Sequence, residues 1–169
     1  MNAGIEPEGA SRPLLQVFSD KVNRASEVFL FLLMLLMIGV TTAQVFFRFF
    51  FEALTWSEEL SCFLLVLASL LGAAVAFKRG THIAVTFLTQ KLPDGARKGA
   101  AVLVNLLGIL FFGIVAVYGV VLMKTEAGQT TPAMMISMAW VYAIYPVLGA
   151  VIILHLAAGI GEILKGGRS

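Results

Sequence analysis

Residues 28–47 read VFLFLLMLLMIGVTTAQVFF, a run of 20 residues without a charged side chain between Glu27 and Arg48. The hydrocarbon core of a bilayer is about 30 Å thick, and a helix needs about 20 apolar residues to cross it. Lipid offers no hydrogen-bond partner to a free N–H or C=O, so such a segment is expected to be helical. Spanning β-strands would be shorter and would alternate in hydropathy. The run therefore predicts a membrane-spanning helix.

Three more charge-poor stretches of similar length follow, and the predicted spans are 28–47, 60–77, 99–123 and 138–161. The composition agrees, because 59% of the residues are hydrophobic and 13% are charged, whereas a soluble domain is nearer one half and one quarter. The sequence predicts an all-α integral membrane protein with four transmembrane helices in a single domain, residues 1–169.

The N-terminal segment 1–24 mixes acidic and basic residues. The apolar run that follows it is too long for the core of a signal peptide, so we expect it to be retained as the first span. A formal net charge of +2 gives no reason to expect a nucleic-acid partner.

The positions of Lys and Arg predict the orientation. Ten of the twelve precede the first span, lie between the second and third, or follow the fourth, and the other two are Arg48 and Lys124. Cytoplasmic segments carry the excess of Lys and Arg, so both termini are predicted to be cytoplasmic. The aromatic side chains of Trp56, Trp140 and Tyr142 then fall at the outer interface, where such rings are favoured.

Residues 80–92 predict a short helix that lies in the cytoplasmic interface and ends before Pro93. Ala84, Phe87, Leu88 and Leu92 would share one of its faces. An ordinary connector is the alternative.

The second span carries two features that indicate contacts. Small residues form a stripe along it, which would let two helix backbones approach closely, either within this chain or with a second polypeptide; they are Ser61, Ala68, Gly72 and Ala76. Glu58 and Glu59 stand at its start. A carboxylate is favoured at a helix N-terminus, and one of the two could instead pair with a partner subunit.

The chemistry-bearing residues are few. His82 and His155 are the two histidines, and a haem held between them would make the chain a membrane anchor of a redox complex.

No Asp, Glu, Lys or Arg lies near the centre of a predicted span, where ion-coupled transporters and small exporters usually place one. No nucleophile–base set, metal-ligand cluster or phosphate loop is found, so we expect neither enzymatic activity nor a cofactor.

Several motifs resemble one family. They are Trp56-Ser57-Glu58-Glu59; residues 71–76 with Lys78-Arg79-Gly80 and His82-Ile83; and Thr131-Pro132-Ala133 with residues 136–142 and Pro146. In this order they resemble the small membrane subunit of TRAP (tripartite ATP-independent periplasmic) transporters, the DctQ family, over about residues 24–161. Thr86 stands where the family often has Asp, which puts the contact of that acid in doubt.

The resemblance implies a bacterial inner-membrane scaffold without a substrate site of its own. Its partners would be a large membrane subunit, which holds the substrate and sodium sites and moves like an elevator, and a periplasmic binding protein that delivers an organic acid. Under this reading Trp56 and Trp140 anchor the outer interface, and Glu58 and Glu59 contact a partner there. Gly72 and its small neighbours form a close helix seam. Lys78, Arg79 and His82 hold the inner interface on anionic lipid headgroups.

Overall fold

The computed structural model describes residues 14–79 and 94–164, and these form four α-helices. They are α1 (Leu14–Phe50), α2 (Thr55–Lys78), α4 (Asp94–Thr125) and α5 (Met138–Leu164). Each contains a stretch long and apolar enough to cross a membrane. The prediction of an all-helical protein with four spans is confirmed. The predicted interfacial helix 80–92 and both chain ends lie outside the described residues, so the cytoplasmic placement of the termini stays a prediction.

The helices are longer than the predicted spans. α1 has 37 residues and begins at Leu14, so at 1.5 Å per residue it is about 55 Å long. Its first turns carry charged residues, and a local hydrogen bond from Asn23 Nδ2 to Glu27 Oε1 of 2.6 Å lies among them. α4 likewise begins before its apolar run. A helix continues into polar sequence as long as its backbone hydrogen bonds are made, and hydropathy marks only its apolar part.

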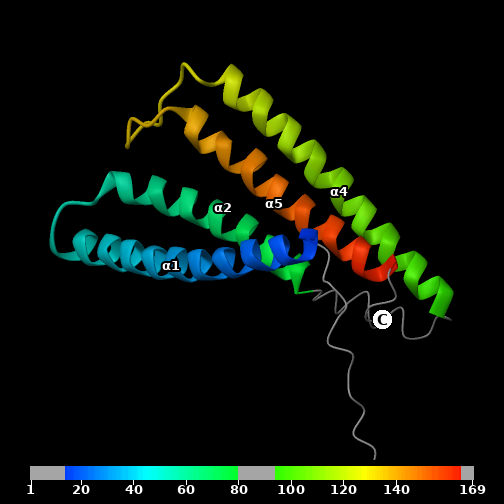
Figure 1. Ribbon diagram of the computed structural model, residues 1–169. Helices are drawn as coiled ribbons and strands as arrows, with labels where there is room; N and C mark the ends of the chain where they lie inside the picture. Colours follow the sequence, from blue (N-terminus) through cyan, green and yellow to red (C-terminus); the bar gives the residue numbers. More distant parts are fainter. Residues whose placement is uncertain (1–13, 80–93, 165–169) are drawn as a thin grey trace, which may run out of the picture.

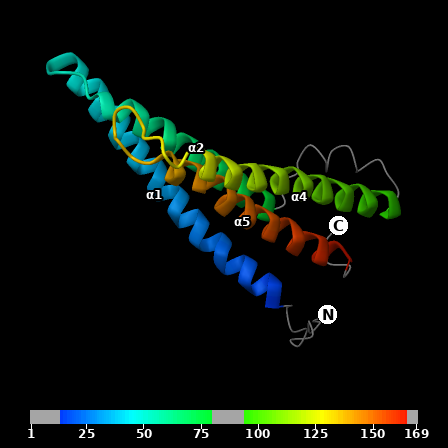
Figure 2. The same cartoon turned by 90° about the horizontal axis from the view of Figure 1, so that it is seen from above.

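The four helices form two antiparallel pairs, α1 with α2 and α4 with α5, with α5 next to the first pair (Figure 1). The α5 backbone approaches all three other described helices, whereas the α4 backbone approaches that of α5 alone among them. The view from above shows the same open arrangement (Figure 2). The four described helices therefore form an elongated, open arrangement and not a closed four-helix bundle.

Two apolar clusters form the core. The first joins α1, α2 and α5 through Leu33, Leu64, Leu71 and Leu148. The second joins α2, α4 and α5 through Ala74, Phe112, Ile152 and Leu156. Phe112 also packs edge-on against Phe77 of α2, with ring centroids 5.7 Å apart. Because α2 and α5 contribute to both clusters, they form the centre of the protein.

Candidate functional site: the two ends and the outward faces

Glu59 joins α2 to the loop between α4 and α5. Its Oε2 accepts hydrogen bonds from the backbone N–H groups of Ala133 at 2.9 Å and Met134 at 3.0 Å. The loop is a tight turn, in which the Thr131 N–H donates to the Ile136 carbonyl at 2.8 Å and Met135 has a positive φ of 56°. The carboxylate thus satisfies two loop donors that no secondary structure would pair. Glu59, predicted to face a partner, makes these contacts within its own chain.

Glu58 lies beside it but differs in exposure. Its side chain is exposed, and its nearest polar contact is a long one of 3.5 Å from Gln44 Nε2. Trp56 is also exposed, at 43%. Of the two predicted acids, Glu58 is the one that a second molecule can reach.

The predicted outer aromatic residues gather at the same end. Trp140, near the start of α5, is 76% exposed. Tyr142 is half-buried, and its ring lies 6.4 Å from that of Tyr145. An exposed indole at a helix end is the arrangement that favours the membrane–water interface.

The small-residue stripe of α2 is not a close seam between the helices of this chain. Ala68 is buried and Ala76 is exposed. A Cβ added at Gly72 would meet only Leu30 Cδ2, at an ordinary 4.0 Å. A seam between the stripe and a second polypeptide stays a prediction.

The close seam lies instead between α4 and α5. A Cβ added at Gly119 would come within 2.8 Å of Pro146 Cδ and of Tyr145 Cβ. One added at Gly108 would come within 2.9 Å of Leu156 Cδ1. The glycine at 119 leaves room for the proline ring inside α5, and such small residues let membrane helices pack backbone to backbone. The sequence shows the glycines of α4, but it does not show which residues of α5 pack against them, because no local spacing relates the two helices.

The predicted inner-interface cations are paired with acids of this chain. Lys78 Nζ lies 2.8 Å from Asp20 Oδ1 and 3.9 Å from Glu162 Oε1, and its side chain is 13% exposed. Arg79 lies 2.9 Å from Glu27 Oε1 and is 60% exposed. Lys78 therefore ties α2 to both α1 and α5. His82, the third predicted member of this group, lies outside the described residues.

A buried polar pair near this end was not predicted. Ser19 Oγ of α1 and His155 Nδ1 of α5 share a hydrogen bond of 2.8 Å, and the two residues are 0% and 1% exposed. The sequence indicated a haem ligand as one possible role of His155, and not a partner on α1. No local pattern links residues 136 positions apart, although a histidine within an apolar helix is itself a signal that a polar partner is needed.

Large apolar side chains of α1 and α4 point away from the protein. Phe31, Leu35 and Ile38 of α1 are half exposed or more, as are Leu110 and Val117 of α4. In water such faces would be unstable, whereas lipid or another membrane protein covers them without cost.

The chain was compared with known proteins. A sequence profile of the DctQ component of tripartite ATP-independent periplasmic transporters matches residues 37–166. The sialic acid TRAP transporter small permease protein SiaQ of Vibrio cholerae is 27% identical over 89% of this chain and 88% of its own length. The sialic acid TRAP transporter permease protein SiaT of Haemophilus influenzae is 27% identical over 88% of this chain, but over 24% of its own length.

A third relative, the C4-dicarboxylate TRAP transporter small permease protein DctQ of Rhodobacter capsulatus, is 33% identical over 55% of this chain and 42% of its own length. Members of this family are inner-membrane transport components, not enzymes, and they work with a large permease subunit and a periplasmic binding protein. This favours transport over the haem-bearing anchor. The chain therefore belongs to the DctQ component family, as the small permease subunit of a TRAP transporter.

Proposed function

We propose that this subunit is the fixed scaffold of a transporter that imports an organic acid with a sodium gradient. The observation that carries the proposal is the distribution of charge. In α1 the charged residues end at Glu27 and resume at Arg48, and Lys78 of α2 lies in ion pairs at the end of its helix. A charged group in mid-membrane usually marks an ion or solute path. A scaffold needs anchoring and shape instead.

The outward apolar faces support this role. α1 and α4 carry exposed Phe, Leu, Ile and Val side chains along much of their length, so the subunit enlarges the membrane-embedded body of its partner. A larger body resists movement in the bilayer and gives the moving part of the large subunit a surface to slide against.

The contacts with the partner follow from exposure. At the outer end, exposed Glu58 and Trp56 serve the large subunit or the docked binding protein, while Glu59 shapes the loop that stands beside them. Along α2, Ala68 is buried within this chain, so the part of the stripe at Gly72 and Ala76 serves as a seam with the large subunit. Trp140 and Tyr142 hold the subunit at the outer membrane interface.

The names of the relatives guide the choice of substrate. Those names mention sialic acid and C4-dicarboxylates, and both are carboxylates. The match within SiaT occupies about a quarter of a longer permease protein, which supports a stable association between a small subunit of this kind and further permease sequence.

Reconstitution tests the proposal. Proteoliposomes would hold this chain alone, the large subunit alone, or both, with the binding protein outside and a labelled carboxylate as substrate. We expect uptake with both subunits, little with the large subunit alone and none with this chain alone. Replacing the sodium gradient by a potassium gradient should abolish uptake.

Two results would overturn the proposal. One is flux through this chain alone, which would make it a small exporter or carrier. The other is full uptake by the large subunit without it, which would leave no scaffold role. An absorption spectrum of the purified chain with haem bands would revive the redox anchor.

A further inference from the structure

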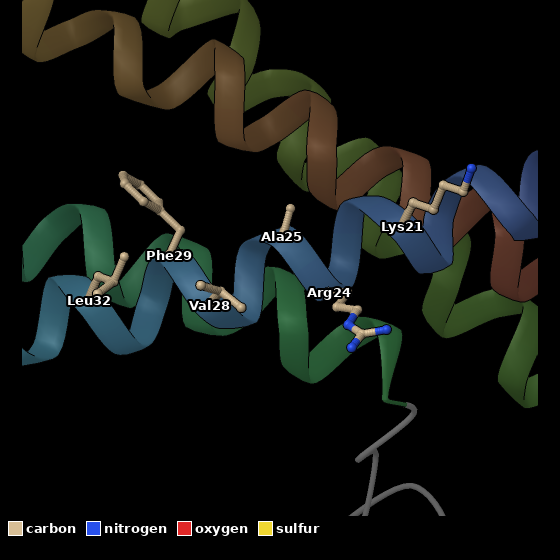
Figure 3. Close-up of a pocket in the computed structure, with 6 residues that line it drawn as sticks. All are labelled: Lys21, Arg24, Ala25, Val28, Phe29 and Leu32. Atoms are coloured by element: carbon tan, nitrogen blue, oxygen red, sulfur yellow. The ribbon is translucent and has the colours of Figure 1, made fainter.

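A shallow groove runs along the first half of α1 and has a volume of about 480 Å³. It is lined by Lys21, Arg24, Ala25, Val28, Phe29 and Leu32. These residues recur at three- and four-residue intervals, so they share one helix face. Figure 3 shows α1 with this face toward the viewer and α2 behind it.

The two ends of the groove differ in chemistry. Lys21 and Arg24 stand at the end nearer the N-terminus, and Val28, Phe29 and Leu32 line the other end. All of these side chains are exposed. From residue 21 to residue 32 the helix rises about 16 Å, so the groove passes from a cationic rim into the apolar run that begins at Val28.

The nearby acids make their ion pairs with other cations, although Arg79 and, more weakly, the charge of Arg24 lower the pKa of Glu27. Asp20 and Glu162 pair with Lys78, and Glu27 pairs with Arg79. Neither Lys21 nor Arg24 forms an ion pair with any residue in the parts of the chain that the structure describes. The positive charge on this face is therefore available to a ligand.

We propose that this groove binds one anionic phospholipid of the inner leaflet. Its phosphate lies between Lys21 and Arg24, and the upper part of an acyl chain lies along Ala25, Val28, Phe29 and Leu32. A cationic rim next to an apolar channel is complementary to an anionic headgroup joined to a hydrocarbon chain, and basic residues beside a membrane helix attract anionic lipid. The site rests on the predicted cytoplasmic orientation of this end and is independent of the scaffold role.

The groove adds a lipid contact to the one predicted for Lys78, Arg79 and His82, which stays a prediction. Lys78 and Arg79 already pair with acids of this chain, whereas Lys21 and Arg24 make no such pair within the described residues.

Native mass spectrometry tests the proposal by measuring how much dioleoyl phosphatidylglycerol binds to the full chain, compared with dioleoyl phosphatidylcholine. The measurement is made on the chain alone and in complex with the large subunit. The double variant Lys21→Gln with Arg24→Gln should weaken phosphatidylglycerol binding by about tenfold or more, because each cation near the membrane surface strengthens the attraction to an anionic headgroup severalfold. Ala25→Trp, which fills the groove without changing charge, should also weaken it.

Two matched double variants are the controls. Arg97→Gln with Lys98→Gln removes the same charge at the start of α4, which lies at the same end of the protein (Figure 1). Arg48→Gln with Lys124→Gln removes it at the ends of α1 and α4. Both should retain binding within about twofold. A phosphatidylglycerol with a photoreactive acyl chain should label residues 25–32.

Three outcomes would overturn the proposal. Equal loss in the groove variant and in the variant at residues 97 and 98 would show diffuse attraction to the whole end. Unchanged binding in both groove variants would exclude the groove. Loss of photolabelling in the complex, with crosslinks from residue 28 to the large subunit, would show that protein and not lipid occupies the groove.

Discussion

The carboxylate of Glu59 accepts two hydrogen bonds, from the backbone N–H groups of Ala133 and Met134, across 74 and 75 positions of the chain. One acid at the start of α2 thus fixes the loop that leads into α5. Charge-assisted bonds to backbone donors are stronger than neutral ones, and donors left without a partner destabilise a fold.

We predict that Glu59→Gln loosens this loop. The neutral amide keeps one acceptor but loses the charge, so hydrogen exchange at the Ala133 and Met134 amides should become about threefold to tenfold faster. The melting temperature in detergent should fall. Glu58→Gln is the matched control, because Glu58 is exposed and makes one long contact. An equal effect of the two variants would show that the Glu59 carboxylate does not hold the loop.

We predict that Ser19→Ala destabilises the chain by about 1–2 kcal/mol, because it leaves the buried His155 Nδ1 without its hydrogen-bond partner. Ser69→Ala serves as the control. The Ser69 hydroxyl is exposed and donates to the Leu65 carbonyl of its own helix at 2.7 Å, so its loss should cost less than about 0.5 kcal/mol. Denaturant unfolding in mixed micelles measures both. Equal stabilities would show that the buried pair contributes nothing.

The fold could be predicted from the sequence, while these two contacts could not. A span of about 20 apolar residues is a local property, and lipid leaves helix as its one economical structure. Accordingly, α5 (Met138–Leu164) begins at the same residue as the predicted span 138–161. The partner of Glu59 or of His155 depends on which helices lie side by side, and no period in the sequence records that.

The helix seam shows the same limit. Gly72 and its neighbours have the four-residue spacing that predicts close approach, yet among the described glycines the closest approaches are made at Gly108 and Gly119 of α4. The spacing of small residues shows that another helix can approach the backbone closely. Which helix approaches it is decided by the packing of the two core clusters on α2 and α5.

The ion pair of Lys78 should contribute more to stability than that of Arg79. Lys78 is 13% exposed and Arg79 is 60% exposed, and screening by solvent weakens exposed pairs. Lys78→Gln should cost about 1 kcal/mol, because the ammonium group is largely buried while its partners Asp20 and Glu162 are half exposed. Arg79→Gln should have a smaller effect, which added salt reduces further. Thermal unfolding at two salt concentrations measures this, and the reverse ranking would refute it.

The seam between α4 and α5 predicts a contrast between two glycines of one helix. Gly119→Ala places a Cβ within 2.8 Å of Pro146 and Tyr145, whereas one at Gly113 meets nothing within 4 Å. The first variant should lose about 1–3 kcal/mol of stability through overpacking. The second should be neutral or slightly more stable, because alanine favours helix. Unfolding by denaturant would refute the seam if both variants behaved alike.

The stripe on α2 predicts a different result for Gly72→Ala. The added Cβ makes an ordinary contact at 4.0 Å with Leu30, so the stability of the isolated chain should change by less than about 1 kcal/mol. If the stripe is the seam with the large subunit, the same methyl group keeps the two backbones apart, and co-purification of the two subunits should fall severalfold. Gly113→Ala, which adds a methyl group to α4 in open space, is the control for co-purification. Normal assembly of the Gly72 variant, with a reduced yield of the Gly113 variant, would place the partner on α4 instead.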